Sequence, residues 1–345
     1  MKISVLYAGL SSPHAGWVAI DELAELLAKY FQAEVLSPKP KSDSWLGHMI
    51  QPHHARFEPL HTTGGDVLIV VARSPSDLGM INTIQNCRKK FTKIFGFITD
   101  SYFQPGFVKE TALFDAITVT AHDDVDYPKT RFGIPVYQLY QGADCQTWVP
   151  REWKDREIEI MSFGRTPPSY HACFSQCFHS ASSPNLYLHS PLGNISGDSV
   201  HLERGMLFKL LHRTRISLAF NLYVEPQGDR PRSMMVTSRW LESLLSGCIV
   251  AGRRPVSRMS DDMLCWPDAT IELSDDPQCA ADELVELLSQ NDSLEKQRRI
   301  NIFQMLSLHD WRYRIEDFCQ LMDLPVPEAL HNDVAHLQEL KSLFV

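Results

Sequence analysis

The chain has 345 residues, of which 33 are Lys or Arg and 42 are Asp or Glu, so its formal charge is −9. This acidic total argues against a general nucleic-acid binder, which needs a basic face over much of its surface. No run approaches the roughly 20 apolar residues of a membrane span, and the N-terminal stretch lacks the features of a signal peptide. We therefore expect a cytoplasmic protein with no transmembrane segment, and a length above about 300 residues predicts two domains.

Apolar runs of strand length alternate with helical stretches through the first 150 residues. An amphipathic helix is expected over Val18–Tyr30, with Leu23, Leu26 and Leu27 on one side. The expected strands are Ile3–Tyr7, Ala33–Leu36, Val67–Val71, Ile94–Ile98, Ile117–Val119 and Val136–Leu139. Continuous apolar strands separated by helices indicate a parallel sheet covered on both faces, so residues 1–150 are predicted to form one doubly wound unit.

The same pattern restarts after a boundary at residues 141–156. The expected strands are Ile158–Phe163, Asn185–Leu188, Arg215–Phe220, Cys248–Ala251 and Thr270–Leu273, and the expected helices are 201–213, 233–246, 278–290, 292–322 and 328–343. The predicted fold class is α/β, with two Rossmann-like domains that face each other across a cleft between their strand carboxyl ends. The second domain is expected over 151–322, and residues 323–345 are expected to pack back on the first domain.

The cysteines are spread along the chain rather than arranged as a disulfide framework. They are Cys87, Cys145, Cys173, Cys177, Cys248, Cys265, Cys279 and Cys319. Reduced thiols are therefore expected. The stretch 171–179, HACFSQCFH, is the nearest approach to a zinc motif, but its spacing favours buried thiols on one helix face.

Positive charge is concentrated between residues 204 and 258. Ten basic residues stand there against three acidic ones, a local charge of 10 − 3 = +7 in an acidic chain. Such a window suggests a site for a small polyanion such as a diphosphate. A solvated face or an acidic protein partner is the alternative.

A helix with polar residues near its start lies inside this window. Pro231 and Ser233 are typical helix-start residues, and Gly247 suits the C-terminal cap, so the helix is expected over 233–246. Its amino end offers unpaired N–H groups and positive dipole to phosphate oxygens. Arg239 and Glu242 are three residues apart, so a surface ion pair is the plainer interpretation of these two.

Residues 237–250, TSRWLESLLSGCIV, resemble the donor-site helix of GT-B glycosyltransferases, in particular the CgeB-like (spore-maturation protein) group within the group 1 glycosyl transferases. The pair 164–165, GR, and residues 310–314, DWRYR, are similar to further motifs of that group. The resemblance covers about 156–320. In the first domain it rests on the 9–16 loop and on residues 66–70, 97–100 and 142–144.

The resemblance implies a hexosyltransferase-type enzyme that transfers a sugar from a nucleotide-sugar donor, UDP- or GDP-linked, without a catalytic metal or other cofactor. Glu242 would hold the ribose hydroxyls, Arg165 and Arg239 would lie against the diphosphate, and Thr237 and Ser238 would add hydrogen bonds. Two departures stand out, because Met234 occupies the position of the usual first glutamate and no lysine follows Arg165. Lys209, Arg215 or Arg232 would then supply the second phosphate cation.

The candidate catalytic residues of the first domain are Asp100, His14 and His122. Asp100 ends a predicted strand and is expected to face the cleft, where a carboxylate can deprotonate an acceptor hydroxyl or else cap the next helix. His14 lies in the loop after the first strand, and His122 begins an acidic stretch that is typical of a helix start.

Three functions remain open at the level of sequence. The first is a glycosyltransferase acting in polysaccharide biosynthesis or on a lipid-linked sugar, a protein or a small molecule, with peripheral membrane contact left open. The second is a nucleotide-sugar epimerase or a phosphorylase of the same fold. The third is an inactive protein that binds a nucleotide sugar or a partner, since fold alone does not determine function.

Overall fold

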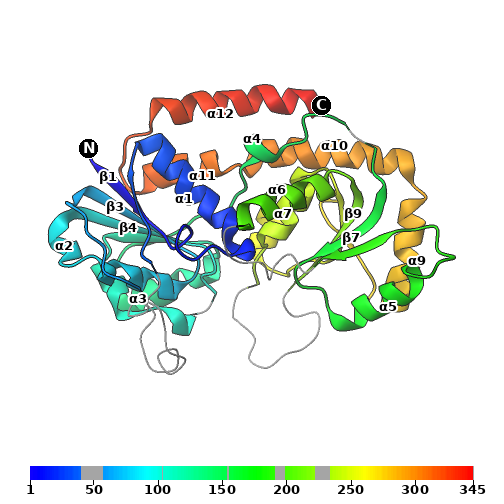
Figure 1. Ribbon diagram of the computed structural model, residues 1–345, viewed down its shortest axis with the longest axis horizontal. Coiled ribbons are helices and arrows are strands. Elements are labelled where there is room, and N and C mark those ends of the chain that lie inside the picture. Colours follow the sequence, from blue (N-terminus) through cyan, green and yellow to red (C-terminus); the bar gives the residue numbers. More distant parts are fainter. Residues whose placement is uncertain (40–56, 103, 154, 191–198, 222–233, 345) are drawn as a thin grey trace.

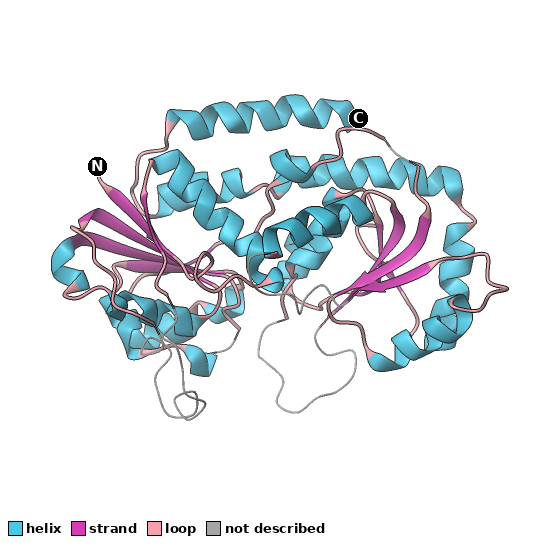
Figure 2. Ribbon diagram, viewed as in Figure 1, coloured by secondary structure: helices cyan, strands magenta, loops and turns pink. Residues whose placement is uncertain are grey.

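The computed structural model describes residues 1–39, 57–102, 104–153, 155–190, 199–221 and 234–344. Two parallel β-sheets lie side by side in an elongated molecule, one built from each half of the chain (Figure 1). Helices lie on both sides of each sheet (Figure 2). Within the described segments, no helix combines the length and apolar character that a bilayer crossing requires.

The first sheet has six parallel strands in the order β2-β1-β3-β4-β5-β6. They are β1 (Ile3–Leu6), β2 (Glu34–Leu36), β3 (Gly65–Ala72), β4 (Phe91–Ile98), β5 (Ala116–Val119) and β6 (Val136–Gln138). In the central strands Val5 pairs with Ile69, and Ile69 pairs with Phe95. The six strands predicted from apolar runs are confirmed. Burial on both faces explains the apolar runs of the central strands, whereas the edge strands β2 and β6 each keep an exposed residue.

Helix α1 (Val18–Phe31) covers one face of this sheet. Leu23, Leu26 and Leu27 are buried against strand residues, as their helical spacing predicts. The remaining helical segments of the first domain are short, and several are 3-10 turns: η1 (Ala15–Trp17), η4 (Pro75–Thr83), α2 (Cys87–Lys90), η5 (Gln104–Gly106), η6 (Lys109–Leu113), η7 (His122–Asp124) and α3 (Asp126–Phe132).

The second sheet has five parallel strands in the order β11-β10-β9-β7-β8. They are β7 (Ile158–Phe163), β8 (Tyr187–Ser190), β9 (Thr214–Phe220), β10 (Ile249–Arg253) and β11 (Ile271–Glu272). The helices in this half are α5 (Pro168–Phe178), α6 (Val200–Leu211), α7 (Ser238–Leu245), α8 (Arg258–Met263), α9 (Pro277–Leu288) and α10 (Asn291–Leu308). The expected α/β arrangement of two Rossmann-like domains is therefore confirmed.

The segment 292–322 is helical, as predicted, but a break at His309 and Asp310 divides it into two helices. Helix α10 ends at Leu308, and α11 (Trp311–Leu321) begins after Asp310, whose side chain caps it. The break allows the chain to change direction between the two domains, since Trp311, Ile315 and Phe318 of α11 pack into the core of the first sheet. Residues 311–322, assigned from the sequence to the second domain, therefore pack with the first.

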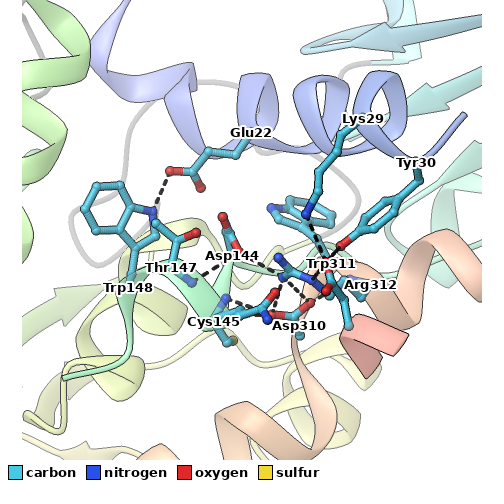
Figure 3. Close-up of polar contacts among 12 residues, drawn as sticks. Glu22, Lys29, Tyr30, Asp144, Cys145, Thr147, Trp148, Asp310, Trp311 and Arg312 are labelled. Carbon is cyan, nitrogen blue, oxygen red and sulfur yellow. Dashed lines mark hydrogen bonds and ion pairs between the residues drawn. The ribbon is translucent and has the colours of Figure 1, made fainter. Parts of the chain in front are cut away.

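The chain crosses between the domains twice, and the two crossings are hydrogen-bonded to each other. The Ala143 N–H donates to His309 O at 2.9 Å, and the Trp311 N–H donates to Ala143 O at 3.0 Å. Beside them the Arg312 guanidinium lies between the carboxylates of Asp144, at 2.8 Å, and Asp310, at 3.0 Å (Figure 3). Helix α4 (Cys145–Trp148) starts at this junction.

The last helix, α12 (Glu328–Lys341), followed by η9 (Ser342–Phe344), packs on both domains rather than on the first alone. Leu330 lies in the core beneath the first sheet, whereas Leu337 and Leu340 lie in the core that contains α7 and α10. Close to its start, Asp333 accepts a hydrogen bond from Tyr30 of α1 at 2.6 Å.

Candidate functional site

A cavity of about 610 Å³ opens between the two domains. Its walls come from the carboxyl ends of β4, β7 and β9, from the loop after β1, and from the start of α7. Ligands of doubly wound folds bind at this edge of the sheet, because the connecting loops there are free to carry polar side chains.

Two arginines of the second domain converge on this cavity. Arg165 follows β7 through Gly164, and Arg239 is the second residue of α7. The Arg239 guanidinium donates to the Arg165 carbonyl and lies 5.6 Å from the centre of the Phe163 ring. Gly164 has φ +67°, and a Cβ there would stand 2.6 Å from Nη2 of Arg239. A glycine is required because it provides both this backbone conformation and the space for the guanidinium.

The two cations carry no counter-ion in the part of the chain that the structure describes. Neither Arg165 nor Arg239 lies within 4.0 Å of a carboxylate there, and Nε of Arg239 is buried without a hydrogen-bond partner. Burial, together with the nearby Arg165, lowers the pKa of Arg239 to about 10, although Glu242 opposes this change. Two close cations with unused donors form a site for an anion.

The start of α7 adds backbone donors to the same wall. Thr237 is the N-cap with extended backbone, and its side chain makes no capping hydrogen bond. The Trp240 N–H donates to the Thr237 carbonyl at 3.2 Å, so the N–H groups of Ser238 and Arg239 are the donors that this end of the helix offers to the cavity. Thr237 and Ser238 line the cavity. The expected start at residue 233 is wrong, because residues 234–237 are not helical and the helix begins at Ser238.

Glu242 also lines the cavity, one turn after Ser238. Its carboxylate accepts a hydrogen bond from the buried Arg204 of α6 rather than from Arg239. The surface ion pair considered from the three-residue spacing is therefore not formed. Arg204 belongs to the basic window identified in the sequence. Its pairing with Glu242 could not be predicted, because the two residues are 38 positions apart and share no motif.

Asp100 stands on the opposite, first-domain wall, two residues after β4. No hydrogen bond to its carboxylate is found within the described segments. Burial raises its pKa to about 7, and Arg165 across the cavity opposes the rise. A carboxyl group with this pKa can accept a proton near neutral pH.

His14 lines the same wall, and its Nδ1 accepts a hydrogen bond from the Gly16 N–H at 3.1 Å. His122 is not part of the cavity lining. Its Nε2 lies 3.8 Å from an Asp262 carboxylate oxygen, and its ring packs against Tyr140. Lys209 is exposed on α6, also away from the lining, and Arg232 lies outside the described residues.

The basic window does not form one positive surface within the described residues. Among its described members, only Arg204 and Arg239 line the cavity. Arg253, Arg254 and Arg258 pair with carboxylates. Nearness in sequence therefore overstated the local charge, because successive strand ends and helices direct their side chains to different faces.

Sequence reasoning missed the aromatic and histidine part of the lining. Trp17, Tyr102 and His189 line the cavity, yet none belongs to a motif with a recognisable spacing.

In the described segments, no group of three or more His, Cys, Asp or Glu side chains is placed to hold a metal ion. Cys173 and Cys177 are half-buried on one face of α5, beside Gln278.

Comparisons with known proteins agree with this architecture. Residues 185–320 match a family model described as glycosyl transferase-like. A search of curated proteins finds no significant match.

Solved structures resemble the whole chain. Anabaena Alr3699/HepE in complex with UDP-glucose has a TM-score of 0.56 at 11% identity, over 94% of this chain and 99% of that one. The same protein with UDP has a TM-score of 0.54 at 10% identity, over 94% and 100%. A DNA-modifying β-glucosyltransferase, studied with and without uridine diphosphoglucose, has a TM-score of 0.51 at 12% identity, over 94% and 100%. The chain therefore has the GT-B fold of glycosyltransferases, with a glycosyl transferase-like region over residues 185–320.

Proposed function

We propose that this protein is a metal-independent glycosyltransferase that moves a sugar from a nucleoside-diphosphate sugar to a hydroxyl acceptor. The observation that carries the proposal is the pair Arg165 and Arg239, two cations that have no counter-ion among the described residues and lie beside the start of α7. A diphosphate is a ligand of matching charge and hydrogen-bonding capacity. Solved structures of the same fold contain UDP or UDP-glucose, which supports a UDP-sugar donor, with a GDP-sugar as the alternative.

The second-domain side of the cavity, called the donor wall below, consists of Arg165, Thr237, Ser238, Arg239 and Glu242. Different residues of this wall would bind the diphosphate and the ribose of the donor. Thr237, Ser238 and the two arginines would bind the diphosphate, and Glu242 would accept hydrogen bonds from the ribose hydroxyls. As the bond between the anomeric carbon and the phosphate oxygen breaks, negative charge grows on the leaving nucleoside diphosphate. Guanidinium groups already aimed at that position stabilise this charge without further rearrangement.

The acceptor would approach from the first domain. Asp100 would take the proton of an acceptor hydroxyl while its oxygen attacks the anomeric carbon and the nucleoside diphosphate leaves. His14 on the same wall is the other candidate base. A proton acceptor opposite the donor wall favours transfer over epimerisation, which acts on the donor alone, and over an inactive binding protein.

The donor site is tested by measuring the affinity of UDP and GDP by calorimetry, with and without EDTA. Arg165→Ala and Arg239→Ala are each expected to weaken binding about 10- to 100-fold, since each removes charged hydrogen bonds. Arg213→Ala is the matched control, because Arg213 is exposed on the same domain and pairs only loosely with Glu157 at 3.8 Å. Equal affinity in all variants, or binding that EDTA abolishes, would contradict the proposal.

A further inference from the structure

A buried ionic cluster joins the two domains beneath the cavity. Arg204 of α6 donates to both carboxylate oxygens of Glu22 on α1, from Nε at 2.8 Å and from Nη2 at 3.1 Å. Its third nitrogen, Nη1, donates to Oε1 of Glu242 on α7. One guanidinium therefore connects a helix of the first domain with the donor wall of the second.

The cluster is largely buried, and aromatic rings pack against it. The Arg204 side chain is only 4% exposed, and its guanidinium carbon is 4.9 Å from the centre of the Phe208 ring. Trp148 stacks on Phe208 at 4.5 Å and donates its indole N–H to Glu22 at 2.8 Å (Figure 3). The positions of all three charged groups are thus restrained by packing as well as by hydrogen bonds.

The charges show that Arg204 is not a free anion-binding cation like Arg165 and Arg239. Burial by itself lowers the pKa of Arg204, but the Glu22 and Glu242 carboxylates outweigh this effect and raise it. Three of its five N–H groups donate to the two carboxylates, which also balance its charge, so it is a weaker diphosphate ligand than Arg165 and Arg239. A ribose bound to Glu242 would therefore be affected by Arg204 through the carboxylate that this guanidinium holds.

We propose that Arg204 is a positioning residue that holds the Glu242 carboxylate for the donor ribose and makes its placement depend on Glu22 of the other domain. This inference rests on the proposed function. Oε2 of Glu242 has no hydrogen-bond partner in the described part of the chain, which leaves it available to a ribose hydroxyl. Glu22 itself is not part of the cavity lining, so any effect of Glu22 on donor binding is transmitted through the guanidinium.

The experiment compares two probes, UDP and inorganic pyrophosphate, in the full-length protein. In the proposed site, pyrophosphate would contact only the two arginines and the start of α7, whereas UDP would also place its ribose against Glu242. Arg204→Lys and Glu22→Gln are expected to weaken UDP binding about 10-fold and 3- to 10-fold, and to leave pyrophosphate binding unchanged. Arg204→Ala is avoided because it leaves two buried carboxylates unpaired and endangers folding.

Asp21→Asn is the matched control for Glu22→Gln. Asp21 is the preceding residue of α1, is similarly buried, and pairs with Arg73 at 2.8 Å inside its own domain. The control is expected to leave the affinity for UDP unchanged. If Asp21→Asn weakens UDP binding as much as Glu22→Gln, the effect is a general disturbance of α1 and the inference is overturned.

A double-mutant cycle tests the connection between the domains. Glu22→Gln and Glu242→Gln act on one guanidinium, so the loss of UDP affinity in the double variant is expected to be clearly smaller than the product of the two single losses. Multiplicative losses would overturn the inference while the donor site stands. If the wild-type protein binds neither UDP nor pyrophosphate, the proposed function itself fails.

Discussion

Asp100 is the side chain whose ionisation bears most directly on the proposed reaction. Burial raises its pKa to about 7, well above the ordinary value for an aspartic acid. As a base it must be deprotonated, so kcat/KM for sugar transfer is expected to rise with pH through about 7. Asp100→Asn is expected to remove this pH dependence of kcat/KM and to lower the rate about 10²- to 10⁴-fold, a range typical of lost proton transfer.

The raised pKa of Asp100 also predicts how folding stability changes with pH, which can be measured without knowing the acceptor. Between about pH 4 and pH 7 the unfolded state has lost the Asp100 proton while the folded state keeps it, so wild-type stability falls as pH rises. Asp100→Asn removes this contribution and should gain stability relative to wild type across that window, as measured by urea unfolding. A difference that stays constant with pH would contradict the raised pKa.

Gly164 offers a second test at the scale of one residue. Gly164→Ala is expected to cost about 1–2 kcal/mol for the left-handed backbone conformation and, in addition, to displace the Arg239 guanidinium and weaken UDP binding. Gly133→Ala is a close control, because Gly133 also has φ +67° but nothing lies within 4 Å of its added methyl. Equal nucleotide affinity in the two variants would show that the space at Gly164 does not matter for binding.

The positions of elements were largely predictable from sequence, whereas their exact starts were not. Continuous apolar runs identified the strands, because buried parallel strands need no other pattern. Helix α7 starts at Ser238 rather than 233, since Thr237 takes the extended N-cap conformation. The pairing of Arg204 with both Glu22 and Glu242 arises only when α1, α6 and α7 meet, which no local pattern encodes.

The break between α10 and α11 is maintained by Asp310, and this gives a prediction at the scale of elements. Its buried carboxylate accepts hydrogen bonds from the N–H groups of Cys145 at 2.8 Å and Arg312 at 2.7 Å, and pairs with the Arg312 guanidinium. Asp310→Ala is expected to cost about 3–5 kcal/mol, since it leaves buried partners unsatisfied.

The matched control for Asp310 is Ser257→Ala. Ser257 caps α8 through a single hydrogen bond to the Ser260 N–H at 3.2 Å, so its loss is expected to cost about 1 kcal/mol. Both costs are read from urea unfolding monitored by circular dichroism. If the two variants lose the same stability, Asp310 acts as an ordinary helix cap and not as the connection between the two crossings.

At the scale of the whole molecule, the two domains share structural elements. Helix α11 follows the second-domain helix α10 in the chain but packs on the first sheet, and α12 packs on both domains. The Glu22–Arg204–Glu242 cluster adds a buried connection between them. The sequence placed the domain boundary at 322 and so assigned α11 to the second domain. Helical periodicity shows which face of a helix is apolar, but not which sheet that face covers.

This sharing predicts that the two domains unfold together, and α12 provides the means to test it. Leu330 and Leu337 are both fully buried, one in the core of each domain, so changing either to Ala is expected to cost about 2–5 kcal/mol. If α12 joins the domains, both variants shift one common transition in urea, followed by tryptophan fluorescence and circular dichroism, whereas Leu343→Ala, 67% exposed, does not. Two separate transitions, each moved by only one variant, would mean that the domains unfold independently and that α12 merely lies across them.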